Sequence, residues 1–117
     1  MHVTAQILTG AVAALHAYFL VLEMFLWERP PGRRLHGQDP ETASKTAVLA
    51  ANQGLYNGFL AAGLVWSLIT GDLGVQVFFL VCVIVAGVYG AATANKRILV
   101  VQAGPAALAL AAALLAA

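Results

Sequence analysis

The stretch that decides the fold runs from Val3 to Trp27 and reads VTAQILTGAVAALHAYFLVLEMFLW. It is long enough to cross a bilayer as an α-helix, for which about 20 predominantly apolar residues suffice. Two ionisable side chains, His16 and Glu23, interrupt it. An ionisable group at such a position costs roughly 2.5–3.5 kcal/mol on insertion scales. The stretch therefore predicts a membrane helix in which His16 and Glu23 are functional or paired.

The composition of the whole chain favours a membrane protein. Of the 117 residues, 62% are apolar and 9% are charged, whereas soluble domains carry about 25% charged residues. We expect an all-α integral membrane protein with one domain, residues 1–117, and room for four spans. The net charge of +1 gives no reason to expect nucleic acid as a partner. The single cysteine, Cys82, excludes an intramolecular disulfide.

Proline, glycine and polar residues divide the chain into a bundle of four transmembrane helices. Asp39-Pro40 and Gly71-Asp72 are typical of helix caps. Pro105 removes one backbone hydrogen bond and predicts a kink in the fourth helix. The segment after the first helix begins Glu-Arg-Pro-Pro-Gly, which a helix interior does not tolerate. We expect helices at about 3–27, 40–70, 72–94 and 98–117, with a cytoplasmic loop at 28–39.

The basic residues predict the orientation of the chain. All six lie in the first and third connections between helices: Arg29, Arg33, Arg34, Lys45, Lys96 and Arg97. The positive-inside rule then places both basic connections in the cytoplasm and both termini on the outer side of the inner (plasma) membrane. A basic run can also mark a site for an anionic lipid or another ligand.

Polar side chains of the helices fall in one layer. At about 100° per residue, His16, Glu23 and Trp27 share one stripe of the first helix. With a rise of about 1.5 Å per residue, the polar groups of the other helices lie in the cytoplasmic half of the membrane, and His16 lies near its middle. We predict a pocket open to the cytoplasm, with Glu23 and His16 as acid–base groups. Its ligand-contacting residues are predicted to be Trp27, Asn52, Gln53, Tyr56, Asn57, Tyr89 and Gln102.

Two helices also have a face of small residues. Gly54 and Gly58 form a Gly-xxx-Gly step in the second helix, and Gly87 and Gly90 lie together on the third. Small residues let helix backbones approach closely. We expect these faces to pack against other helices, and a homo-oligomer through either face is one arrangement of this kind.

Each candidate residue also has a purely structural interpretation. Asn57 and Gln102 could serve as hydrogen-bond links between helices, and Trp27 as an interface anchor. Glu23 could be a neutral carboxyl group held by Asn52 or Tyr56, and His16 a hydrogen-bonded core residue.

We predict no metal site and no cofactor. His16 and Glu23 are two turns apart, roughly 10 Å along the axis, which is too far to chelate one ion. The chain has no phosphate-cradling loop, Ser–His–Asp set or cofactor fingerprint.

Three segments of the sequence resemble an uncharacterised family of small four-helix bacterial membrane proteins, known as a domain of unknown function. They are Leu22–Trp27, Ala50–Leu60 and Ala86–Gly90, followed by Gln102 and Pro105. The resemblance covers essentially the whole chain and implies a four-helix membrane fold, but no activity. His36 departs from it, because an aromatic residue is expected at that position.

Three functions fit the predicted pocket. The first is acid–base chemistry on a lipophilic small molecule or lipid, such as isomerisation, cyclisation or epoxide opening, none of which needs a cofactor. The second is proton-coupled transport, since the chain resembles small multidrug exporters in size and layout. The third is a non-catalytic membrane subunit that binds a partner through its glycine-rich faces.

Overall fold

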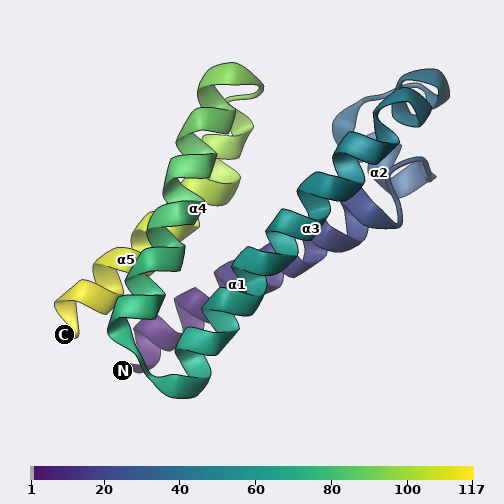
Figure 1. The fold of residues 1–117 in the computed structure, drawn as a ribbon. Helices are drawn as coiled ribbons and strands as arrows, with labels where there is room; N and C mark the ends of the chain where they lie inside the picture. Colours follow the sequence, from purple (N-terminus) through teal and green to yellow (C-terminus); the bar gives the residue numbers. More distant parts are fainter. Residues whose placement is uncertain (1) are drawn as a thin grey trace. The chain divides into compact units, whose positions relative to one another are not determined.

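The computed structural model describes residues 2–117, and all regular structure in this range is helical (Figure 1). The all-α class predicted from the sequence is therefore confirmed. The elements in chain order are α1 (Val3–Met24), α2 (Pro30–His36), α3 (Pro40–Thr70), α4 (Leu73–Thr93), the π-helical segment η1 (Leu99–Ala103) and α5 (Gly104–Leu115).

Two of these helices are long and apolar enough to cross a membrane. They are α1, with 22 residues, and α4, with 21 residues. The residues of η1 and α5 form a shorter apolar helical stretch, Leu99–Leu115. The longest helix, α3, has 31 residues and a more polar composition. Length and composition thus identify two candidate spans, while the four-span arrangement and its orientation stay predictions.

The chain divides into two compact units. One comprises the residues up to Ala14 together with Leu60–Ala117, and the other is Leu15–Phe59. In the first unit four helices contribute to a single apolar core, in which α4 and α5 lie side by side (Figure 1). The core residues are Val12 and Ala13 of α1, Leu64 of α3, Leu80 and Val83 of α4, and Ala106 and Ala109 of α5.

The last predicted helix, residues 98–117, changes its hydrogen-bond pattern before Pro105. Residues Leu99–Ala103 form a π-helical turn, and the N–H of Gly104 bonds to the carbonyl of Leu99. Pro105 then occupies the first turn of α5. Proline has no N–H to give to the carbonyl four residues earlier, so a regular α-turn cannot continue through it. The widened turn stands where the sequence predicted a kink.

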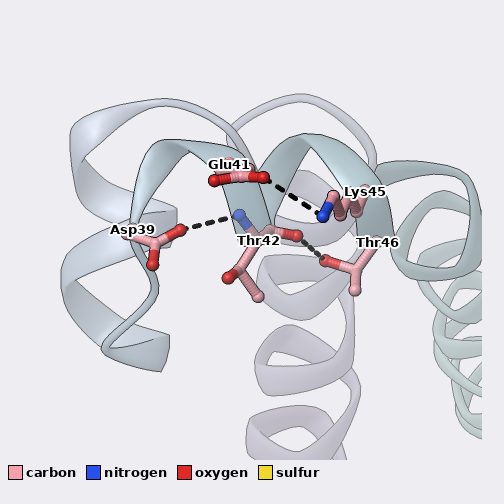
Figure 2. A network of polar contacts seen from close by, with 5 residues as sticks. All are labelled: Asp39, Glu41, Thr42, Lys45 and Thr46. Carbon is pink, nitrogen blue, oxygen red and sulfur yellow. Dashed lines mark hydrogen bonds and ion pairs between the residues drawn. The ribbon is translucent and has the colours of Figure 1, made fainter.

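The predicted helix caps are present. Gly71 follows α3 with a left-handed φ of 67°, and the side chain of Asp72 accepts a hydrogen bond from the N–H of Val75 at 3.1 Å. At the start of α3, Asp39 Oδ1 accepts from the N–H of Thr42 at 2.7 Å, as Figure 2 shows. Both carboxylates satisfy N–H groups that have no partner within their helix.

The segment predicted as a loop, residues 28–39, contains helix α2, and α1 ends at Met24 rather than at Trp27. Prolines occupy the first turn of α2, where their missing N–H groups would have no partner in any case. The helix ends at Gly37, which has a φ of 61°. A loop was predicted here because proline is not tolerated inside a helix. These prolines lie in the first turn of α2 instead, where they are tolerated.

Candidate functional site

The small face of α3 is the surface on which α1 packs within the unit Leu15–Phe59. Gly54 is buried there, and a Cβ atom added to it would lie 2.8 Å from Met24 Cγ and 3.0 Å from Glu23 Cβ. A Cβ atom added to Gly58 would meet the side chain of Leu20. The Gly-xxx-Gly step therefore serves close packing within the chain.

The second small face also makes contacts within the chain. In the unit that contains α4, Gly87 is buried against Ala103 of η1, and Gly90 faces the side chain of Ile98. Both glycine faces proposed for a homo-oligomer are therefore already occupied by other helical segments of the same chain.

This packing of α1 on α3 brings Glu23 to Asn57. The Asn57 Nδ2 group donates a hydrogen bond to Glu23 Oε1 at 2.5 Å, and both residues are partly buried. Asn57 lies three residues after Gly54, and residues at that spacing share one side of a helix. The sequence predicted Asn57 as a ligand contact or as a hydrogen-bond link between helices, and the structure makes it the partner of the carboxyl group.

The other three residues of α3 predicted to line the pocket are exposed. Asn52, Gln53 and Tyr56 are all exposed, and Tyr56 is 66% exposed. Asn52 Nδ2 donates to the carbonyl of Val48 in the same helix at 3.0 Å. At 100° per residue, Asn52 and Tyr56 point almost directly away from Gly54. The structure does not bring these three side chains to Glu23.

His16 lies two turns before Glu23 on α1 and is only 1% exposed. Its ring packs edge-on against Phe19, with 5.4 Å between the ring centroids. The two turns place it about 10 Å along the helix axis from Glu23. His16 and Glu23 are therefore separate groups on one helix and make no direct pair.

Trp27 follows the end of α1 and connects two later helices. Its Nε1 group donates to Thr46 Oγ1 at 3.0 Å, and its ring lies 4.6 Å from the ring of His36 at the end of α2. The hydroxyl of Thr46 in turn donates to the carbonyl of Thr42 at 2.8 Å (Figure 2). Trp27 therefore has a structural role, because it links α2 and α3 just after the end of α1. The planar ring of His36 makes the contact between Trp27 and α2.

Tyr89 of α4 and Gln102 of η1 belong to the other unit of the chain. Tyr89 is exposed and Gln102 is partly exposed. The predicted pocket that combines them with Glu23 stays a prediction.

One buried polar pair was missed by the sequence analysis. Gln76 Nε2 of α4 donates to Thr9 Oγ1 of α1 at 2.8 Å, and both side chains are fully buried in the first unit. A glutamine inside an otherwise apolar helix was the available signal, because polar groups in such helices seek a partner. The pair ties the start of α1 to α4.

The Glu23–Asn57 pair is the candidate site that this geometry supports. A carboxyl group can give or take a proton when a substrate reaches it. The amide of Asn57 contacts one carboxyl oxygen and thereby fixes the orientation of the group. Glu23 is only partly buried, so part of its side chain remains accessible.

Comparison with known proteins finds a family profile that matches most of the chain. A profile described as "Protein of unknown function (DUF1304)" matches residues 10–114, which include both Glu23 and Asn57. A relative described as "Uncharacterized protein YpaA", from Lactococcus lactis subsp. lactis (strain IL1403), is 31% identical over 114 residues. That match covers 94% of this chain and 96% of the relative. No solved structure matches the chain.

Proposed function

This chain belongs to the DUF1304 family of unknown function, and we propose from its own residues that it is a four-span membrane protein that exchanges a proton with a bound lipophilic molecule. Glu23 is the proton-exchanging group in this proposal, and Asn57 holds it in place. The hydrogen bond between these two side chains is the observation that carries the proposal.

The outward surfaces of the helices support a membrane environment. Val48 and Ile69 on α3 are 75% and 80% exposed, and Leu115 on α5 is 88% exposed. Soluble monomers rarely expose large contiguous apolar patches. With α1 and α4 as two spans, α3 and the η1–α5 stretch would supply the other two. The positions of the basic residues then favour termini on the outer side.

A carboxyl group in this position favours acid–base chemistry. Ionisable groups in membrane helices are costly, and by default they mark a functional site. Isomerisation, cyclisation and epoxide opening require a group that gives or takes a proton at the right place, and they need no cofactor. His16 is the other predicted acid–base residue on α1 and would act deeper in the membrane. Asn52 and Tyr56 face the other side of α3 and Gln53 is exposed, so we place all three outside the acid–base group.

Comparative mass spectrometry tests the proposal. Membrane extract and medium are analysed separately from cells that express wild type, Glu23→Gln or the matched control Glu28→Gln, which alters an exposed carboxyl group just beyond α1. We expect one lipophilic compound to be chemically changed with wild type and Glu28→Gln but not with Glu23→Gln. An unchanged compound that only moves between cells and medium would contradict turnover and indicate proton-coupled transport. Identical profiles in every fraction would contradict a functional role of Glu23.

Cysteine labelling tests the proposed orientation separately. In a Cys82→Ala background, single cysteines replace two exposed residues on either side of α4: Thr70, the last residue of α3, and Ala94, which directly follows α4. We expect a membrane-impermeant maleimide to label the cysteine at position 70 in intact cells, and the cysteine at position 94 only after permeabilisation. The reverse pattern would contradict the orientation, and labelling of both in intact cells would contradict the span.

A further inference from the structure

A second polar site lies at α2, apart from Glu23. A cavity of about 360 Å³ opens there, and its lining residues are Pro30, Arg33, Arg34, Gly37 and Gln38. All of them belong to the unit Leu15–Phe59. Two arginines in adjacent positions give this cavity a positive charge, and a backbone hydrogen bond from the Gln38 N–H to the Arg33 carbonyl, 3.0 Å long, joins two of its lining residues.

Two polar atoms of the lining are buried without a hydrogen-bond partner among residues 2–117. They are Arg33 Nε, a donor, and Gln38 Oε1, an acceptor. A buried donor or acceptor that stays unpaired costs about 1–3 kcal/mol, and more when it is charged. Both atoms belong to residues that line the cavity, and because each is covered by protein atoms, its side chain must turn towards the cavity to contact a ligand.

The arginines also have no carboxylate of their own. The one ion pair within residues 2–117 joins Lys45 to Glu41 at 3.1 Å, as Figure 2 shows. The carboxylate of Glu41 is thus already paired with Lys45, and the carboxylate of Asp39 accepts a hydrogen bond from the backbone N–H of Thr42. No carboxylate within residues 2–117 forms an ion pair with Arg33 or Arg34, so their positive charge is available to an anion from outside the chain.

We propose that this cavity binds a phosphate group that carries a neighbouring hydroxyl group. The planar guanidinium fork of arginine matches two oxygens of a phosphate, and the Nε donor is part of that fork. Gln38 Oε1 accepts from the hydroxyl group beside the phosphate. The headgroup of phosphatidylglycerol has this chemistry, and free inorganic phosphate has the phosphate alone.

The position of the cavity favours the lipid as the source of the phosphate. Gly32 of α2 is buried against the backbone of Leu26 and Trp27, directly after the end of α1. A basic segment beside the end of a membrane helix lies at the depth of the headgroups, where anionic lipids attract Lys and Arg. The choice of a lipid rather than free phosphate is the only part of this inference that rests on the proposed membrane location. The phosphate site itself does not depend on the proposed role of Glu23.

Lipid binding to the full-length protein in non-ionic detergent tests the inference. Native mass spectrometry measures affinities for phosphatidylglycerol and phosphatidylcholine of identical acyl chains, and calorimetry measures the affinity for inorganic phosphate. The test variant is Arg33→Gln/Arg34→Gln, and the matched control is Lys96→Gln/Arg97→Gln, which removes the same charge from the other basic connection. Circular dichroism verifies the helix content of each variant.

We expect wild type to prefer phosphatidylglycerol and the test variant to bind it about tenfold more weakly or worse, because charged hydrogen bonds are lost. The control should stay within about twofold, because salt and solvent screen distant charges. Arg33→Lys keeps the charge but loses the Nε donor, so it too should bind more weakly than wild type. Gln38→Met should reduce the preference for the glycerol headgroup over choline.

Equal weakening by the test and control variants would overturn the inference, because net charge alone would then explain binding. Wild-type protein that binds none of the three probes would overturn it as well. Inorganic phosphate binding that depends on Arg33 and Arg34, without any lipid preference, would support the phosphate site and identify free phosphate as the source. Loss of lipid binding with an unchanged Glu23-dependent metabolite profile would separate this site from the proposed function.

Discussion

Asn57 of α3 donates its side-chain amide to the carboxyl group of Glu23 on α1, across 34 positions of sequence. The contact depends on two features of the same face of α3. Gly54 lets the backbone of α1 approach, and Asn57 stands one turn further along on that side. A larger residue at the first position or an apolar residue at the second would remove the contact.

Replacing Asn57 tests the pair directly. Asn57→Leu removes the donor to Glu23, and we expect it to destabilise the protein by about 1–3 kcal/mol, because a partly buried carboxyl group loses its partner. Asn52→Leu is the matched control on the same helix. Its amide bonds only to Val48 of its own helix, so a change within about 0.5 kcal/mol is expected. Thermal unfolding in detergent measures both, and equal effects would contradict the assignment of Asn57.

Gly54→Ala tests the close packing of α1 on α3. The new methyl group would lie within 3.0 Å of Met24 Cγ and Glu23 Cβ, and overpacking of this kind costs about 1–3 kcal/mol. Gly10→Ala is the control, since its methyl group would approach only Leu68 Cδ1, at 3.9 Å. Alanine is the better helix former by up to about 1 kcal/mol, so Gly10→Ala should be neutral or stabilising. A neutral Gly54→Ala would show that the two helices are not in close contact.

The buried Thr9–Gln76 pair predicts a non-additive result. Thr9→Val leaves the Gln76 amide without its partner in a fully buried position, which costs about 1–3 kcal/mol. The double variant Thr9→Val/Gln76→Leu removes both polar groups and should recover most of that loss. Unfolding midpoints of the two single variants and the double variant measure the coupling, and additive losses would mean that the two side chains do not interact.

Asp39 should make the folded protein less stable at acidic pH. The backbone N–H of Thr42, and then its side chain, lower the pKa of Asp39 from its ordinary value of 3.8. The folded pKa lies below the unfolded one, so the stabilisation is fully present above the unfolded pKa and is lost as the pH falls through the folded pKa. Below about pH 4 the unfolding midpoint of wild type should therefore fall. The Asp39→Asn variant should lack this part of the fall in the unfolding midpoint. An identical pH profile for wild type and Asp39→Asn would contradict the role of Asp39 as a helix cap.

Local chemistry made both ends of α3 and the start of α4 predictable. Asp39, Gly71 and Asp72 act as caps whatever the rest of the chain does, since each of them serves backbone groups a few residues away. The start of α2 was missed because prolines end helices in some positions and begin them in others.

The partner of Glu23 depends on which side of α3 meets α1. The small face of that helix was predicted from its glycines, but Asn52 and Tyr56, which lie away from this face, were the partners suggested for Glu23. In the structure the small face packs against α1, because glycines permit the closer contact, and Asn57 is the polar residue that lies on that side. Periodicity alone does not choose between two faces of one helix.

The most direct test of the account is modification of the full-length protein in membranes with dicyclohexylcarbodiimide, which partitions into apolar phases and reacts with carboxyl groups there. Peptide mass spectrometry then maps the modified residue. We predict modification at Glu23 and none at the exposed Glu28 and Glu41, which a water-soluble carbodiimide should modify instead. Modification of Glu28 or Glu41 by the apolar reagent while Glu23 stays unmodified would contradict an accessible intramembrane carboxyl group.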